Sequence, residues 1–313
     1  MPESGNPASR KTAPRKTHAR KAASGKTGAR KTAPRSATAS RPKPAPDVSG
    51  SRGERVLITG ASTGIGEALS RRFAAGGFDL VIVARSRDKL GDSARRLAAE
   101  HGVNVQVIAL DLTAPEAPHV LFDAISRLGL DIDVLVNNAG VLEMGAFRTM
   151  DAATLGRMIR LNTGVLTELA ALFVPAMAAR KSGRILNVAS LASFQPVPSL
   201  AAYAATKAFV LSLTESLAEE LRGDGVTVTA LCPGITETNM FDTIKRGNER
   251  TDYLPSFLVS DVEDVAREGY EACMKGEVVR VPGLANAMTA TIGRASPRWL
   301  TRLVAGAIGR QMM

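Results

Sequence analysis

Apolar residues fall into two kinds of segment from about residue 53 onward. Short runs of consecutive apolar and β-branched residues predict buried strands, and the longer segments between them repeat apolar residues at the spacing of helices. The predicted strands are Val56–Thr59, Asp79–Ala84, Asn104–Leu110, Val134–Val136, Gly183–Ser190 and Val278–Val281. Strands and helices that alternate in this rhythm predict an α/β fold, with a doubly wound parallel sheet of about seven strands and helices on both faces.

Two of the helical segments are well defined by the pattern. A long one runs from about Asp151 to Lys181, and another is predicted to open at a capping box formed by Ser260 and Glu263 and to end near Met274. No run of consecutive apolar residues reaches the ~20 residues that a membrane-spanning helix needs. We therefore expect no spanning segment.

The segment Leu284–Met313 follows the last predicted strand. Its apolar residues recur at helical spacing with arginines between them, and Pro297 is expected to start a second helix. We expect this extension to pack on its own domain or across a dimer. Contact with a membrane surface is the less favoured alternative.

Residues 1–52 differ in composition from the rest of the chain. They hold thirteen Lys or Arg residues against two acidic ones, a net charge of +11, and so account for the +10 of the whole chain. Lys, Arg, Ala, Pro, Ser and Thr dominate, and such a segment cannot bury enough apolar surface to offset its ordering entropy. We therefore expect three parts: a disordered, basic, low-complexity tail at 1–52, a folded α/β domain at 53–283 and the helical extension at 284–313.

Three roles fit the composition of the tail. The favoured one is a solvated tail without a specific partner, and the others are a weak nucleic-acid contact and an organelle-targeting leader. Only Cys232 and Cys273 are present, which fits a reducing compartment, and the first residues are too polar for a secretory signal. The expected location is cytoplasmic, with organelle targeting through the tail as the alternative.

Glycines mark the junction between the first predicted strand and the helix after it. Gly60, Gly64 and Gly66 stand as G-x-x-x-G-x-G directly behind Val56–Thr59. Glycines at such a junction permit a tight turn, let backbone N–H groups approach a pyrophosphate and place that anion at a helix N-terminus. The pattern predicts a dinucleotide site of the Rossmann type.

The ends of the second and third strands bear on which dinucleotide binds. The second run ends at Ala84 and Arg85, where an NAD site would place a carboxylate for the ribose 2′-hydroxyl. Arg85 offers a guanidinium for a 2′-phosphate instead, which favours NADP(H) over NAD(H); the alternative is a solvated surface arginine. Asp111, after the third strand, is expected to accept from the adenine amino group or to cap the following turn.

Tyr203 and Lys207 are four residues apart in a predicted helix, so they share one face about a turn apart. Ser190 stands thirteen residues upstream, at the end of a predicted strand. A phenol, an ammonium group and a hydroxyl brought together can protonate a carbonyl oxygen. Ser190 lies in N-V-A-S-L rather than G-x-S-x-G, which does not support a nucleophilic serine. The three His lie outside every motif, so neither a His-based triad nor a metal is expected.

Six motifs, in order along about 55–283, resemble the short-chain dehydrogenase/reductase family, in particular its NADP-dependent ketoreductases and ketoacyl reductases. They are T-G-x-x-x-G-I-G at Thr59–Gly66, N-N-A-G at Asn137–Gly140, Asn162, Ser190, Y-x-x-x-K at Tyr203–Lys207 and P-G-x-x-x-T at Pro233–Thr238. Y-x-x-x-K alone carries little information, whereas six motifs in family order carry much. The resemblance implies an oxidoreductase that reduces a ketone or aldehyde, or oxidises the alcohol, by hydride transfer with NADP(H).

The resemblance also implies roles for individual residues. Tyr203 would be the acid/base and Ser190 would orient the substrate oxygen. Asn162 would hold a water for a proton relay to Lys207. Lys207 and an oxidised nicotinamide, both positive, would stabilise the phenolate of Tyr203. Thr238 would contact the nicotinamide carboxamide. The expected cofactor-binding residues, from the glycine turn, the strand ends and the family motifs, are Gly60, Ser62, Thr63, Gly64, Ile65, Gly66, Arg85, Asp111, Leu112, Asn138, Ala139, Gly140, Tyr203, Lys207, Pro233, Gly234, Ile235 and Thr238.

Apolar segments flank these groups in the layout of the family. The loop Leu191–Ala202 and the segments Asn239–Phe241 and Tyr253–Leu258 are expected to line a pocket for a small apolar carbonyl or alcohol substrate, or only to pack a lid. Family members are often dimers or tetramers, so a homo-oligomer is expected. The alternative function is a non-catalytic dinucleotide-binding regulator or scaffold, tethered to nucleic acid through the basic tail.

Overall fold

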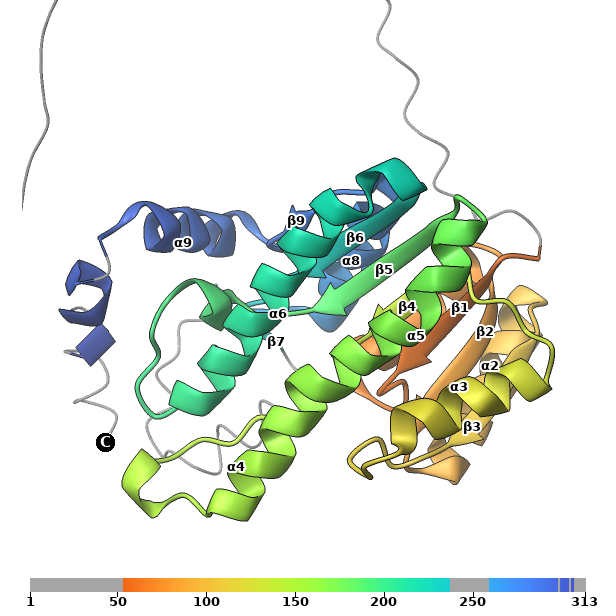
Figure 1. Ribbon diagram of the computed structural model, residues 1–313, viewed down its shortest axis with the longest axis horizontal. Coiled ribbons are helices and arrows are strands. Elements are labelled where there is room, and N and C mark those ends of the chain that lie inside the picture. The colour runs from red at the N-terminus through yellow and green to blue at the C-terminus, as the bar shows by residue number, and fades with distance from the viewer. Residues whose placement is uncertain (1–52, 237–258, 298, 304, 307–313) are drawn as a thin grey trace, which may run out of the picture. The chain divides into compact units, whose positions relative to one another are not determined.

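The computed structural model describes residues 53–236, 259–297, 299–303 and 305–306, which all belong to one compact unit, Pro46–Met313 (Figure 1). The basic tail at 1–52 lies outside the described residues. The division of the chain into three parts therefore stays a prediction.

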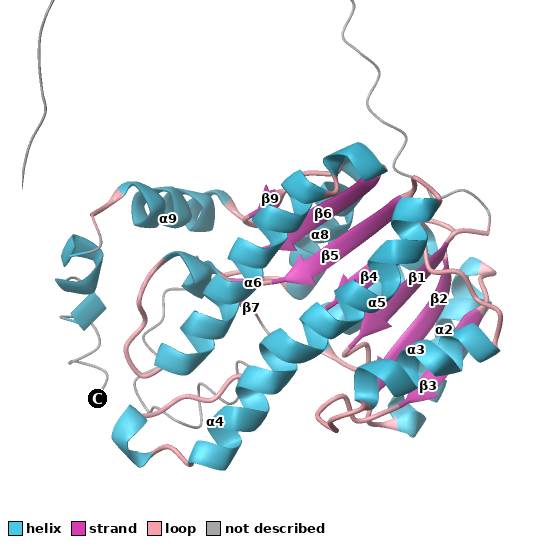
Figure 2. Cartoon of the chain, in the orientation of Figure 1, coloured by secondary structure: helices cyan, strands magenta, loops and turns pink. Residues whose placement is uncertain are grey.

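Seven parallel strands form the main sheet of the described residues, in the order β3-β2-β1-β4-β5-β6-β9 (Figure 2). They are β1 (Arg55–Thr59), β2 (Asp79–Ala84), β3 (Val105–Ala109), β4 (Val134–Asn137), β5 (Gly183–Val188), β6 (Val226–Leu231) and β9 (Val279–Arg280), and a separate parallel pair joins β7 (Ile235–Thr236) to β8 (Val259–Ser260). The strand order reverses between β1 and β4, so the predicted doubly wound fold is confirmed. The apolar pattern did not single out β6, because two threonines alternate with its valines.

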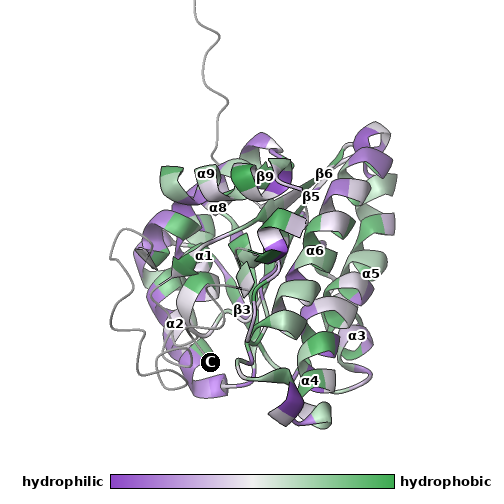
Figure 3. Cartoon of the chain, turned by 90° about the vertical axis from the view of Figure 1, so that its left-hand side faces the viewer, coloured by the Kyte–Doolittle hydropathy of each residue, from purple (hydrophilic) through white to green (hydrophobic). Residues whose placement is uncertain are grey.

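Helices cover both faces of the sheet, which Figure 3 shows nearly edge-on between them. One hydrophobic cluster joins the sheet to α1, α2 and α8, and the other joins it to α3, α5 and α6. The helices are α1 (Gly64–Ala75), α2 (Arg87–His101), α3 (Ala117–Arg127), α4 (Ala152–Ile159), α5 (Leu166–Ala179), α6 (Ala201–Glu220), α8 (Val262–Lys275) and α9 (Leu284–Ala295), with the π-helical turn η2 (Arg160–Val165) and the 3-10 turns η1 (Phe147–Thr149), η3 (Leu191–Phe194) and η4 (Arg222–Asp224).

The central strands are buried on both sides. In β1, Val56 and Ile58 belong to one hydrophobic cluster and Leu57 to the other, as the two-residue period of a strand requires. Parallel strands between two helical layers therefore appear in the sequence as continuous apolar runs. This is why the strands predicted from such runs fall close to the observed bounds.

One continuous helix, Ala152–Ala179, is made of α4, η2 and α5. By length and composition alone, it is long and apolar enough to cross a membrane. The expectation that no segment spans a membrane rested on uninterrupted apolar runs and stays a prediction, because scattered polar residues interrupt the apolar run of this helix. Leu169, Phe173 and Met177 are buried in the cluster that packs on the sheet, which accounts for the apolar character within this fold.

The start of α8 differs from the predicted capping box. Asp261 is the N-cap, and its carboxylate accepts hydrogen bonds from the backbone N–H groups of Glu263 and Asp264. Ser260 belongs to β8 and pairs with Thr236 of β7. The capping assignment was wrong because strand pairing takes Ser260, while aspartate is an equally good cap one residue later.

The C-terminal extension begins with α9, which lies beyond β9 at one edge of the sheet (Figure 1). A further helical segment covers 299–303. The N–H groups of Leu300 and Thr301 donate to the carbonyl of Pro297, so the predicted start of a second helix at Pro297 is confirmed.

Candidate active site

The predicted site residues gather where parallel strands end. Gly60 follows β1, Asn138 follows β4 and Ser190 follows β5, and these three strands are neighbours in the sheet. The carboxyl ends of parallel strands lie along one edge, on either side of the point where the strand order reverses. That edge is where ligands bind in open α/β folds.

The glycine turn between β1 and α1 has the conformation that the sequence predicted. Gly60 and Gly64 have backbone φ values of +67° and +60°, which residues other than glycine rarely adopt. A Cβ on Gly66 would collide with the carbonyl of Gly60 and the side chain of Asn138. The first amides of α1, from Gly64 on, face this turn without partners inside the helix, so the residues present fit the phosphates of a dinucleotide.

Thr59 holds the N-N-A-G turn against the glycine turn. Its Oγ1 accepts from the backbone N–H groups of Asn138 and Ala139, both at 3.0 Å, and donates to the carbonyl of Val136 at 3.2 Å. The amide of Asn138 donates to the carbonyls of Thr59 and Gly60 at 2.9 and 3.2 Å. Thr59 was not among the predicted site residues, although it opens the T-G-x-x-x-G-I-G motif.

Arg85 is exposed directly behind β2, where the sequence placed it. The carboxylate of Asp111 accepts from the backbone N–H and the hydroxyl of Thr113 at 2.9 and 2.8 Å. These bonds, and to a smaller degree the charge of Arg85, hold the pKa of Asp111 below its ordinary value. Of the two expected roles, the structure therefore contains the turn cap. The side chain of Leu112 is buried in the core, which leaves its backbone for a ligand.

Tyr203, Lys207 and Ser190 meet at the start of α6. Lys207 Nζ lies 5.8 Å from the centre of the Tyr203 ring and donates to the carbonyl of Val188, the last residue of β5, at 2.7 Å. The side chain of Ser190 lies near enough to the phenol of Tyr203 to lower its pKa, and its Oγ accepts from the N–H of Ala192 at 3.1 Å. The four-residue spacing in the helix thus produces the predicted group.

Burial controls the protonation of this group. Burial raises the pKa of Tyr203 to about 12, against a smaller lowering by the neighbouring side chain of Ser190. It lowers the pKa of Lys207 to about 8, because the ammonium group is removed from water. Stabilisation of the phenolate would lower the pKa of Tyr203. The protein groups alone raise it instead.

Asn162 lies in the π-helical turn and is buried. Its Oδ1 accepts from the N–H of Val141, and its Nδ2 donates to the carbonyl of Val141 and to Thr206 Oγ1, at 2.9, 2.9 and 3.2 Å. A Cβ on Gly140 would lie 3.1 Å from Asn162 Oδ1 and 3.6 Å from Lys207 Nζ, so these groups face one another across a glycine. The amide of Asn162 ties the strand-end loop to α6.

The P-G-x-x-x-T segment closes the site from the side of β6. The carbonyl of Pro233 accepts from the N–H of Leu191 at 2.8 Å, and Ile235 belongs to β7. A Cβ on Gly234 would lie 2.6 Å from the buried amide of Asn286, which extends from α9. Asn286 carries no motif signal and was not predicted. Thr238 lies outside the described residues.

Apolar side chains pack around Tyr203. Leu142 and Met158 are buried with it, and partly buried apolar residues complete the cluster: Val141, Met144, Leu155, Ala192, Leu200 and Ala202. The predicted lining segments Asn239–Phe241 and Tyr253–Leu258 lie outside the described residues.

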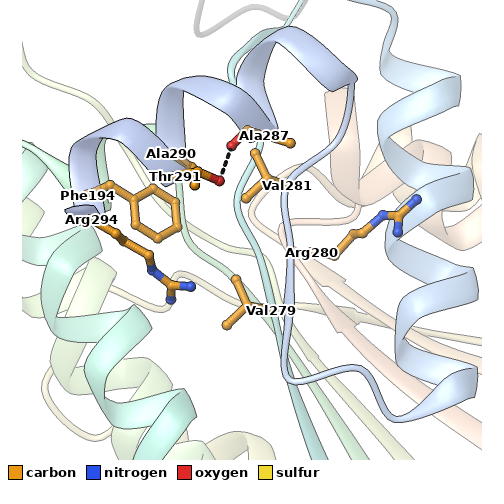
Figure 4. Close-up of a pocket in the computed structure, with 8 residues that line it drawn as sticks. All are labelled: Phe194, Val279, Arg280, Val281, Ala287, Ala290, Thr291 and Arg294. Carbon is orange, nitrogen blue, oxygen red and sulfur yellow. Dashed lines mark hydrogen bonds between the residues drawn. The ribbon is translucent and has the colours of Figure 1, made fainter. Parts of the chain in front are cut away.

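A cavity of about 250 Å³ opens between β9 and α9 (Figure 4). It is lined by Phe194, Val279, Arg280, Val281, Ala287, Ala290, Thr291 and Arg294. The guanidinium of Arg294 lies 4.9 Å from the centre of the Phe194 ring. Phe194, expected in the substrate pocket, therefore packs towards α9.

A glycine turn that fits pyrophosphate and a buried phenol beside a serine and a lysine are the groups that an oxidoreductase acting on carbonyl and alcohol carbons needs. Among the residues that the structure describes, no three His, Cys, Asp or Glu side chains are grouped as metal ligands. The family model for short chain dehydrogenase matches residues 54–249, and the chain belongs to the short-chain dehydrogenase/reductase family.

Similar proteins fit this assignment. The very-long-chain 3-oxoacyl-CoA reductase of Bos taurus is 30% identical over 254 residues, covering 79% of this chain and 77% of the relative. Among solved structures, a short-chain dehydrogenase from Sphingobium yanoikuyae in complex with NADPH is 36% identical, with a TM-score of 0.68 and coverage of 83% of this chain and 95% of that one. The bulky-bulky ketone specific alcohol dehydrogenase from Comamonas testosteroni is 32% identical, with a TM-score of 0.65 and coverage of 82% and 93%. The non-catalytic alternative is not favoured by these relatives.

Proposed function

We propose that this oxidoreductase reduces bulky apolar ketones, or oxidises the corresponding secondary alcohols, and that it uses NADP(H) in preference to NAD(H). The observation that carries the proposal is the grouping of Ser190, behind β5, with Tyr203 and Lys207 of α6, in which Lys207 Nζ lies 5.8 Å from the centre of the Tyr203 ring. A carbonyl oxygen that accepts from both hydroxyls would receive its proton from Tyr203.

Each residue of the group has a separate task. NADPH, when bound, supplies the hydride for the carbonyl carbon. Ser190 Oγ orients the carbonyl oxygen, and Tyr203 Oη donates the proton as charge develops there. Lys207, in its protonated form, stabilises the phenolate that remains. Asn162 positions the loop at Val141 and the helix at Thr206, which keeps Lys207 beside Tyr203.

Two features support NADP(H). Arg85 is exposed at the end of β2, where a dinucleotide fold places the adenosine ribose, and no carboxylate occupies that position. The relative from Sphingobium yanoikuyae is in complex with NADPH. A guanidinium pairs with a phosphate through two parallel hydrogen bonds, so Arg85 would discriminate in favour of the 2′-phosphate.

The substrate class follows from the surroundings of Tyr203. The described side chains packed around it are apolar, with Leu142 and Met158 buried against it. Two of the relatives are named for very-long-chain 3-oxoacyl and bulky ketone substrates, while another is an L-sorbose reductase. A polyhydroxylated substrate would bury hydroxyl groups without partners among such side chains, which is costly.

A matched panel of ketones tests the proposal. Consumption of NADPH and of NADH is measured with apolar ketones of increasing bulk and with polyhydroxylated ketones of equal carbon number. We expect kcat/KM to rise with apolar bulk, to be at least roughly tenfold lower for the hydroxylated partner of each pair, and to be higher with NADPH. A preference for hydroxylated ketones would contradict the substrate class, and turnover of none of them would contradict the proposed function.

A further inference from the structure

Exposed apolar side chains are concentrated in the C-terminal extension. In α9, Leu284, Met288 and Ile292 are 88%, 66% and 63% exposed, and their four-residue spacing places them on one face of the helix. Trp299 and Leu303, again four apart, are 63% and 64% exposed. Scattered exposed apolar residues need no explanation, but rows on two successive helical segments indicate a binding surface. We call these five residues the C-terminal apolar face.

The inner side of α9 is firmly anchored. Ala290 is buried, and the buried Asn286 donates to Ser260 Oγ and to the carbonyl of Pro282 at 3.3 and 3.0 Å. Arg294 pairs with Glu215 of α6 and lies over the ring of Phe194. The exposed row therefore belongs to a helix held in place by its opposite side.

The charged residues of the extension itself all have one sign. Glu277 is the last acidic residue of the chain, and residues 284–313 contain four arginines and no Asp, Glu, Lys or His. The charge of Arg294 is balanced by Glu215, whereas Arg302 is exposed and no ion pair is found for it within the described part of the chain. An apolar face in a segment whose only charged residues are arginines complements a surface that is both apolar and anionic.

We propose that the C-terminal apolar face binds the surface of a membrane rich in anionic phospholipid. Leu, Ile and Met side chains enter the acyl region, tryptophan suits the boundary between acyl chains and headgroups, and arginines pair with lipid phosphates. A two-fold contact with a second copy would bring two faces of the same positive charge together. A nucleic acid would satisfy the arginines but leave the apolar residues in water. The basic tail adds attraction to an anionic membrane without involving this face.

Trp299 makes the face directly observable, because it is the only tryptophan in the chain. Its fluorescence reports on this face and not on the tail. Full-length protein is mixed with vesicles of neutral lipid, or of neutral lipid with a third of phosphatidylglycerol, with and without bromine on the acyl chains. We expect a blue shift of the emission with anionic vesicles, quenching by the brominated acyl chains, and a much weaker response with neutral vesicles.

A pair of double variants separates the face from general charge effects. Met288→Glu with Ile292→Glu changes two exposed apolar residues of the face and leaves Trp299 in place. Val120→Glu with Leu128→Glu makes the same charge change at residues 47% and 48% exposed on and beside α3. We expect vesicle affinity to fall at least roughly tenfold in the first pair, because two apolar side chains no longer enter lipid. The second pair should bind within about threefold of the wild type.

Three outcomes would overturn the proposal. Binding to vesicles without a shift of Trp299 emission would show that the tail alone makes the contact. A blue shift that appears on raising the protein concentration without lipid would show that a second copy covers the face. Absence of vesicle binding, or equal loss in both double variants, would show that the face does not bind lipid.

Discussion

Burial shifts the proton affinities of Tyr203 and Lys207 towards their neutral forms. The pKa of the phenol rises to about 12 and that of the ammonium group falls to about 8. Charge near the phenol decides how readily it gives up its proton, so the protonated form of Lys207 is the state that assists proton transfer. The pair was predicted from its spacing, but its electrostatics depend on burial that no spacing reveals.

The buried Lys207 should make the free energy of unfolding depend on pH. Between pH 8 and its ordinary value of 10.5, the unfolded chain holds a proton that the folded chain has lost, so the free energy of unfolding rises with pH. We expect the difference between wild type and Lys207→Met, measured by urea unfolding, to rise across this window by on the order of 3 kcal/mol in favour of the wild type. Lys89→Met, at an exposed position, should keep the wild-type pH dependence. Parallel profiles of wild type and Lys207→Met would contradict the burial of this charge.

The charge of Arg85 is proposed to select NADPH over NADH. Replacing it by alanine should raise the KM for NADPH roughly tenfold or more, since a hydrogen-bonded charge pair is lost, and should change the KM for NADH less than about threefold. Steady-state kinetics with both cofactors measure this. Arg127→Ala, an exposed arginine at the end of α3, is the control and should alter neither. Equal effects of Arg85→Ala on the two cofactors would refute the phosphate contact.

At the scale of secondary structure, a few side-chain hydrogen bonds join the helices and strand-end loops that carry the catalytic group. Asn162 is the clearest case, because its amide joins the π-helical turn to Val141 and to Thr206 of α6. The sequence predicted Asn162 from a family motif and the helix from its periodicity. It gave no sign of the π-helical turn, which inserts no unusual residue. The local geometry at Asn162 is a product of packing between helices.

The role of this link can be measured by removing the amide. Asn162→Ala should lower the free energy of unfolding by about 2 kcal/mol, because one buried and two part-buried hydrogen bonds are lost and the backbone of Val141 is left without its partner. Thr163→Ala, in the same turn, loses one hydroxyl bond to the carbonyl of Ile159 at an exposed position and should cost about 0.5 kcal/mol. Similar costs for the two variants, by chemical denaturation, would mean that Asn162 does not hold the turn.

At the scale of the elements, the sequence predicted most of the sheet and little of its periphery. Continuous apolar runs such as Asp79–Ala84 were recognised because both sides of the strand are buried. The alternating β6, the cap of α8 at Asp261 and the contact of Asn286 with Gly234 were missed. Each depends on a partner distant in the sequence, which a local pattern does not contain.

At the scale of the whole molecule, the fold places two functions at different edges. The catalytic group lies at the carboxyl ends of β1, β4 and β5, while the C-terminal apolar face lies beyond β9. The helix α9 connects the two regions, through Asn286 at Gly234 and through Arg294 over Phe194. A homo-oligomer, a cytoplasmic location and a nucleic-acid contact of the tail remain predictions from the sequence.

The central claim is that Tyr203 donates the proton in carbonyl reduction. Its most direct test is Tyr203→Phe, which removes one hydroxyl, with NADPH consumption and NADPH binding both measured. We expect kcat to fall roughly 10²–10⁴-fold, the contribution of a general acid, while the Kd for NADPH stays within about threefold. Tyr270→Phe, a buried tyrosine in the core beside Phe73, is the control and should keep its turnover. Turnover of Tyr203→Phe within tenfold of the wild type would contradict the claim.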